Sequence, residues 1–183
     1  MTQARIIGNL GDSLSGSSNT DISFDSNTLY IDAVNNRVGF GTTTPTQKVD
    51  IVGSANVSGT LVAGVIQNTT IKNYYETVNV LGNTSTTITL DLNTATTFSA
   101  TLNANCTFSF ANPPRSGNVG NILLILTNNH VSNTTVTWPN TVIWTGGITP
   151  PKTTTNNAVD IWSFFTVNGG NTWIGTLAAA DLR

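Results

Sequence analysis

The chain has 183 residues, of which 38% are hydrophobic and only 9% are charged, and its formal net charge is −2. It contains 33 threonines, 24 asparagines and 14 serines, which are poor helix formers. This composition excludes a long-helix protein, a highly charged disordered chain and a basic nucleic-acid binder, and no run approaches the ~20 apolar residues of a membrane span. We therefore expect an all-β protein with a neutral surface, no nucleic-acid partner and no membrane insertion.

Residues 1–20 are rich in Gly and Ser and contain too few apolar residues to fold alone, so we expect an extended arm that anchors the chain to a partner. Within the arm, Gly11–Leu14 reads Gly-Asp-Ser-Leu, the signature of the GDSL esterases, whose serine is the nucleophile. The family has an aspartate three residues before its catalytic histidine, and this chain has Thr127 three residues before its single histidine, His130. A serine without its base is a weak nucleophile. We predict no enzyme activity, no metal and no cofactor.

Residues 21–66 contain short alternating segments separated by tight turns. Each segment offers only one or two apolar residues to a face, too few to close a core within one chain. Three identical chains around an axis would supply the missing neighbours, and the low charge favours a surface that is buried against other subunits. We predict a trimeric β stem with strands at 22–25, 28–32, 37–41, 48–52 and 56–62, and a core of Val38, Phe40, Val49, Ile51, Val57 and Leu61.

Residues 67–76 are polar and form a predicted junction, after which residues 77–183 form a predicted head. Regular short strands with Asn, Gly and Pro turn signals are typical of a β-sandwich or jelly roll. Ile122–Leu126 is apolar throughout and predicts a central strand covered on both faces, with Asp160–Val167 as its partner. The first candidate strand begins within the junction. The candidate strands are 74–81, 86–92, 96–102, 106–110, 119–127, 133–138, 141–145, 157–167 and 172–177.

The four tryptophans and the single cysteine lie in this predicted head. Cys106 has no partner for an internal disulfide and lies in an alternating segment, so we expect it to be buried as a small hydrophobic residue. Trp162 and Trp173 are expected in the core. Trp138 and Trp144 lie near turns and are candidate contacts for a sugar ring, in which case the head would bind a glycan.

Two stretches resemble modules of tailed-bacteriophage virion proteins. Asn36–Pro45 reads NRVGFGTTTP and is followed by QKVDI and GSANVSGTL, a series that is similar to an element of trimeric fibre shafts. Residues 87–183 contain TVTWP, VIWTGG, AVDIWSFF and GNTWIG in that order, and this series looks like a C-terminal β-sandwich of phage tail-fibre and other virion surface proteins.

The resemblance implies a non-catalytic, homotrimeric, fibre-like structural protein of the virion. Residues 1–20 would attach it to capsid, neck or tail proteins, and it would be assembled in the bacterial host cytoplasm and displayed on the virion surface. Two alternatives remain open, a decoration trimer that stabilises the capsid shell and a receptor-binding adhesin whose head contacts host surface glycans. An enzyme of the GDSL kind is the third reading.

Overall fold

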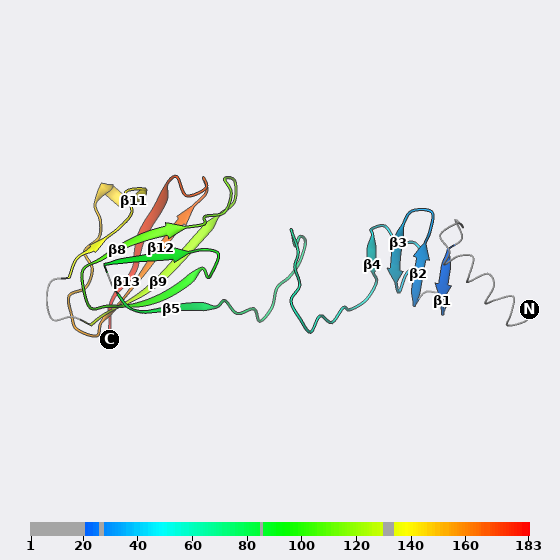
Figure 1. Cartoon of the computed structure of the whole chain (residues 1–183), viewed down its shortest axis with the longest axis horizontal. Coiled ribbons are helices and arrows are strands. Elements are labelled where there is room, and N and C mark those ends of the chain that lie inside the picture. The colour runs from blue at the N-terminus through cyan, green and yellow to red at the C-terminus, as the bar shows by residue number, and fades with distance from the viewer. Residues whose placement is uncertain (1–20, 26–27, 85, 130–133) are drawn as a thin grey trace, which may run out of the picture. The chain divides into compact units, whose positions relative to one another are not determined.

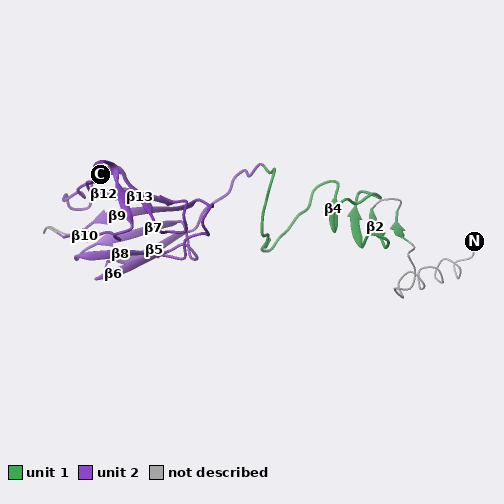
Figure 2. Ribbon diagram, turned by 90° about the horizontal axis from the view of Figure 1, so that it is seen from above, with its two compact units in different colours: residues 1–69 green, residues 70–183 purple. Residues whose placement is uncertain are grey.

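A computed structural model of the chain describes residues 21–25, 28–84, 86–129 and 134–183 (Figure 1). Regular structure in these residues consists of strands and one short 3-10 turn, η1 (Thr145–Gly147), which confirms the all-β fold class. The chain divides into two units, residues 1–69 and 70–183 (Figure 2). The predicted anchoring arm at residues 1–20, which includes Ser13, and the histidine His130 lie outside the described residues.

The first unit contains a four-stranded sheet with the order β1-β2-β3-β4. The first two pairings are antiparallel and the third, between β3 and β4, is parallel. Asp32 closes the turn between β2 and β3 by accepting hydrogen bonds from the backbone nitrogen and the Nδ2 of Asn35, both at 2.8 Å. The strands are β1 (Ile22–Phe24), β2 (Leu29–Asp32), β3 (Arg37–Phe40) and β4 (Val49–Ile51).

The strand predicted at residues 56–62 is wrong, because residues 52–77 contain neither helix nor strand. Glycines at 53, 59 and 64 interrupt the apolar pattern of this segment. Glycine weakens a strand, and an isolated strand has no neighbour to complete its backbone hydrogen bonds. The segment therefore forms no strand within one copy of the chain.

The second unit consists of a six-stranded and a three-stranded sheet, with the orders β11-β13-β12-β9-β7-β5 and β10-β8-β6. From β5 to β11, successive strands alternate between the two sheets. As a result, β5 pairs in parallel with β7 and β7 with β9 in one sheet, while β6 pairs in parallel with β8 and β8 with β10 in the other. The six-stranded sheet contains β5 (Val78–Asn83), β7 (Thr97–Leu102), β9 (Gly120–Asn128), β11 (Val142–Trp144), β12 (Val159–Thr166) and β13 (Trp173–Leu182). The three-stranded sheet contains β6 (Thr87–Asp91), β8 (Cys106–Ala111) and β10 (Val136–Thr137).

The hairpin β12–β13 lies between β9 and β11 in the six-stranded sheet. The pairing of β12 with β9 is antiparallel and confirms the predicted partnership of Asp160–Val167 with Ile122–Leu126. The predicted cover on both faces of β9 is wrong for one copy of the chain, because Leu123 is 36% exposed and Ile125 is half-buried. Only alternate residues of β9 face the core, so the run is apolar on a sheet face that nothing in this unit buries.

The two sheets of the second unit pack against each other through aromatic side chains. Phe110 on β8 contacts Phe164 on β12 and Trp173 on β13, with ring centroids 4.9 Å apart in both pairs. Trp162 and Trp173 are buried, and so is Cys106, as the sequence predicts. Such contacts bury large apolar areas and add ~0.5–1.5 kcal/mol per aromatic pair beyond that burial.

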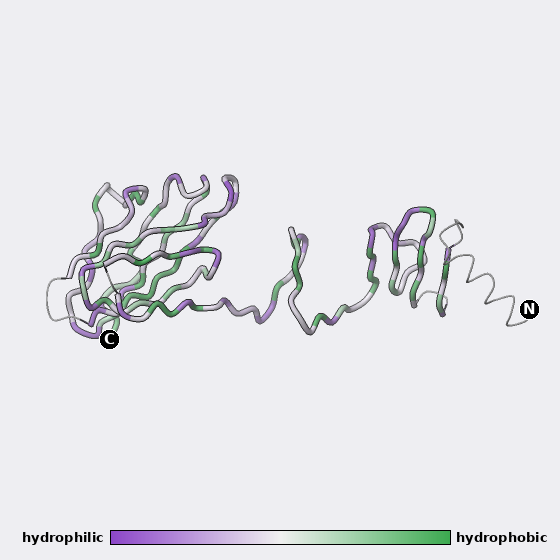
Figure 3. Tube along the Cα trace, viewed as in Figure 1, coloured by the Kyte–Doolittle hydropathy of each residue, from purple (hydrophilic) through white to green (hydrophobic). Residues whose placement is uncertain are grey.

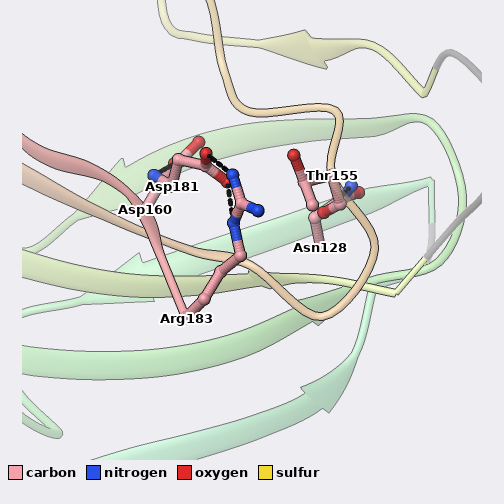
Figure 4. Close-up of polar contacts among 5 residues, drawn as sticks. All are labelled: Asn128, Thr155, Asp160, Asp181 and Arg183. Atoms are coloured by element: carbon pink, nitrogen blue, oxygen red, sulfur yellow. Dashed lines mark hydrogen bonds and ion pairs between the residues drawn. The ribbon is translucent and has the colours of Figure 1, made fainter.

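Backbone contacts to the buried carboxylate of Asp160 hold the C-terminal end of β13 (Figure 4). Its two oxygens accept hydrogen bonds from the backbone nitrogens of Thr153, at 2.7 Å, and of Asp181, at 3.1 Å. Asp181 in turn forms an ion pair with Arg183. Nearby, Asn128 Nδ2 donates to the carbonyl of Thr155 at 2.9 Å. The backbone at Asp181 is thus held by its hydrogen bond to Asp160.

Candidate assembly interface

The register of the first unit brings its apolar side chains to one face of the sheet. Residues directly opposite each other in neighbouring strands point to the same side. One row is Ile22, Ile31, Val38 and Val49, each the register partner of the next. The next row, two residues along each strand, holds Phe24 opposite Leu29 and Phe40 opposite Ile51. We name these eight residues the stem face.

The other side of the same sheet is polar or small. Tyr30 is the register partner of both Ser23 and Gly39, and Gly39 is the partner of Asp50. At Gly39 a side chain has no room, because a Cβ there would lie 2.4 Å from the carbonyl oxygen of Thr42. The loop after β3 therefore folds tightly over this side, and the stem face lies on the opposite side.

The first unit has no hydrophobic core of its own in the part that the structure describes. The residues buried between positions 21 and 69 are Asp32, Gly39 and Pro45, none of which is aliphatic or aromatic. On the stem face, Phe40 is 43% exposed and Val49 is 59% exposed. Burying an aliphatic or aromatic side chain is worth ~1.5–3 kcal/mol, so this sheet leaves much of its available stabilisation unused in one copy.

Polar contacts fix the loops around the sheet. Arg37 Nη1 donates to the carbonyl of Pro45 at 2.8 Å, and Lys48 Nζ donates to the carbonyl of Asn36 at 3.0 Å. Asp50 accepts from the backbone nitrogen and the Oγ1 of Thr46, and these hydrogen bonds hold its pKa below the ordinary value of 3.8. Hydrogen bonds from the side chain and backbone of Asn35 lower the pKa of Asp32 in the same way. The sheet is thus held in shape by its turns.

Exposure continues along the segment that follows β4. Every residue from 51 to 78 is exposed, and Figure 3 shows hydrophobic positions recurring along this stretch. Scattered exposed apolar residues are normal, but this many large ones within one short segment favour an interaction surface. Its large apolar residues include Val52, Val57, Leu61, Val62, Val65, Ile66, Ile71, Tyr74 and Tyr75.

The structure brings together four of the six residues predicted for the stem core. Val38 and Val49 share one row of the stem face, and Phe40 and Ile51 share the other. Val57 and Leu61 are 53% and 66% exposed and belong to the strandless segment. The sequence prediction omitted Ile22, Phe24, Leu29 and Ile31, although the alternation in Ile22-Ser23-Phe24 and Leu29-Tyr30-Ile31 carries the signal.

The two tryptophans predicted as glycan contacts are half-buried. Trp138 stacks on Phe108, with ring centroids 5.0 Å apart, and lies 4.9 Å from Trp162. Trp144 meets Trp162 edge-on at 5.7 Å. Trp138 and Trp144 also line an open hollow of about 440 Å³ together with Asn140 and Thr149. Both rings thus belong to the aromatic core, and their contact with a sugar stays a prediction.

No group of three or more His, Cys, Asp or Glu residues in the described part of the chain is arranged to hold a metal ion. Among the described residues no helix is long and apolar enough to cross a membrane. Comparison with protein-family models, with curated proteins and with solved structures found no match to this chain.

Proposed function

We propose that the protein is a non-catalytic structural component of a tailed-phage virion. It is a homotrimer in which the first unit forms a shared stem and the second unit forms a head. Two things support the virion assignment, the shaft-like series from Asn36 to Leu61 and the tail-fibre-like series in residues 87–183. The low charge also fits a chain whose surface is largely covered by other subunits.

The stem face is the observation that carries the proposal. Eight aliphatic and aromatic residues lie on one side of a sheet that buries none of them. A copy of the same face is a suitable partner, because the stem face has no charged residue that would repel it. Three such sheets around an axis enclose all three faces at once, and the turns that shape each sheet stay outside.

The mass of the full chain in solution tests this proposal. Sedimentation velocity or light scattering at micromolar concentration is expected to give three times the chain mass of 19.3 kDa. A monomer at that concentration would contradict the proposal, because the stem face would then be stable in water.

Imaging of purified virions tests the virion assignment and separates its two structural forms. An antibody label on the second unit is expected on the particle. A few labelled sites at the tail or neck identify a fibre, and many sites over the shell identify capsid decoration. Virions without label would refute the assignment even if the chain is a trimer.

A further inference from the structure

The second unit also has an uncovered apolar face, on the outer side of its six-stranded sheet. Ile143, Ile174 and Phe165 are successive register partners on β11, β13 and β12. One row further, Leu123 is the partner of Ser163 and of Thr97, and Thr97 is the partner of Val78. The next row contains Ile161, Ile125 and Val80, with Ser99 between the last two. We name this surface the head face.

The apolar side chains of the head face are open in one copy of the chain. Leu123, Phe165 and Ile174 are 36%, 38% and 40% exposed, although β9, β12 and β13 are interior strands of the sheet. The opposite side of the same strands is the aromatic core. An interior strand with exposed large apolar residues is typical of a surface that another protein covers.

The strands of the head face carry no charged side chain on their outward side, and the one carboxylate beside them is that of Glu76, which precedes β5 and accepts a hydrogen bond from Thr97 Oγ1 at 3.4 Å. The outward positions of β5, β7, β9 and β12 are occupied by aliphatic and aromatic residues together with Ser, Thr and Asn. Because a single carboxylate lies at the edge of the sheet, its apolar rows repel no copy of themselves and offer few ion pairs to a charged partner. The hydroxyls among the apolar residues can form hydrogen bonds across a symmetric contact. These features favour a second copy of the chain over a charged partner.

The size of the head face fits such a contact. Six strands spaced ~4.8 Å apart, with central strands of about eight residues at ~3.3 Å each, cover roughly 600 Å². Each partner in a stable interface of standard size contributes about 800 Å². The head face therefore supplies most of the area that a stable contact needs, and the stem face adds to it in the same assembly.

We infer that the head face is a second interface between copies of this chain, so that head and stem assemble together. This inference rests on the proposed self-assembly and extends it from the first unit to the second. The head then takes part in the trimer through its own sheet rather than hanging free from the stem.

Thiol protection tests the inference in the full chain. In a Cys106→Ala background, Leu123→Cys places a thiol on the head face, and Thr107→Cys places one on the exposed outer side of β8. In the assembled protein, N-ethylmaleimide is expected to react at least tenfold more slowly at position 123 than at position 107. Dilution to the monomer should raise the rate at position 123 and leave the rate at position 107 unchanged. Ser163→Cys, the register partner of position 123, is a nearly isosteric second probe in case the first variant folds poorly.

The outcomes separate this inference from the proposed function. If the protein is a trimer and the thiols at 123 and 163 react as fast as in the monomer, the head face is not an interface, and the stem trimer stands. If the protein is a monomer at all accessible concentrations, the proposed self-assembly fails, and this inference fails with it. Slow reaction at 123 and 163 that depends on protein concentration supports both.

Discussion

A single charge on the stem face should weaken assembly strongly, and Val49→Lys is the sharpest version of that test. Val49 is 59% exposed on β4. Val34, in the turn between β2 and β3, is 61% exposed and lies off the stem face. Because the two valines are equally open in one copy, Val34→Lys is a matched control. Only assembly distinguishes the two substitutions.

The magnitude follows from the area that assembly would cover. Full burial of a valine is worth ~1.5–3 kcal/mol, so covering the 59% that Val49 still exposes contributes about 1–2 kcal/mol per copy. Three copies lose about 3–6 kcal/mol of trimer free energy, which corresponds to about two to four decades in the association constant. Burying an unpaired ammonium costs several kcal/mol more for each copy, so this figure is a lower bound.

Sedimentation equilibrium over a wide concentration range measures the effect. Val34→Lys is expected to keep the association constant of the unchanged chain, and Val49→Lys to lower it by at least two decades. Circular dichroism checks that the head still folds in both variants, as expected because both substitutions lie in the first unit. Equal association constants for the two variants would refute the assignment of the stem face as an interface.

Three further outcomes concern the fold itself. Phe164→Ala should lower the free energy of unfolding of the second unit by ~3–5 kcal/mol in urea titrations, because Phe164 is fully buried among aromatic rings. Gly175→Ala should cost ~1–3 kcal/mol in the same assay, because its Cβ would lie 2.6 Å from Trp144 Cζ3. The thermal midpoint of unfolding should decrease when the pH is lowered below about 4, because hydrogen bonds in the fold lower the pKa of Asp32, Asp50 and Asp91.

The sign of the acid effect follows from the direction of these pKa shifts. A carboxyl whose folded pKa lies below its ordinary 3.8 stabilises the fold above that pH. This contribution is lost as the pH falls through the folded value. A thermal midpoint that stays constant between pH 5 and pH 2 would contradict the effect. For the two core substitutions, a loss of less than 0.5 kcal/mol would show that the packing around Phe164 or Gly175 is not as described.

The sequence predicts the strands well, because period-two alternation is a local property. Thr87–Leu92 alternates cleanly, and Ile122–Leu126 and Asp160–Val167 were predicted as partners from their apolar content alone. Cys106 and Trp162 were placed in the core for the same reason. These features depend on neighbours along the chain, which the sequence displays directly.

The pairing of the strands was harder to predict because it depends on where the chain goes after each turn. Asn93-Thr94 and Asn103-Ala104 mark turns. Their residue types do not show whether the next strand forms a hairpin with the strand before it or joins the other sheet, as it does in the structure. The same limit explains β9, whose apolar run was read as buried on both faces. A run that is covered only by an assembly has the same composition as a run that is covered by its own chain.

The sequence predicts only four of the eight residues of the stem face, because the strand register decides which residues share a face. Val38 and Phe40 belong to the shaft-like motif and were selected with it. Ile22 and Ile31 join them only once β1, β2 and β3 are aligned. Val57 and Leu61 continue the apolar series of the motif, but the strand stops at Ile51.

The scarcity of charge on the stem and head faces has a consequence for the conditions under which an assembly through these faces would hold together. Contacts that depend on ion pairs weaken when salt is added, because dissolved ions screen the charges from each other. At 0.1 M the screening length is ~10 Å. Contacts between uncharged hydrocarbon surfaces are not screened, and salting-out anions such as sulfate strengthen them. Subunits joined through such faces would stay joined in fresh water and in brine alike.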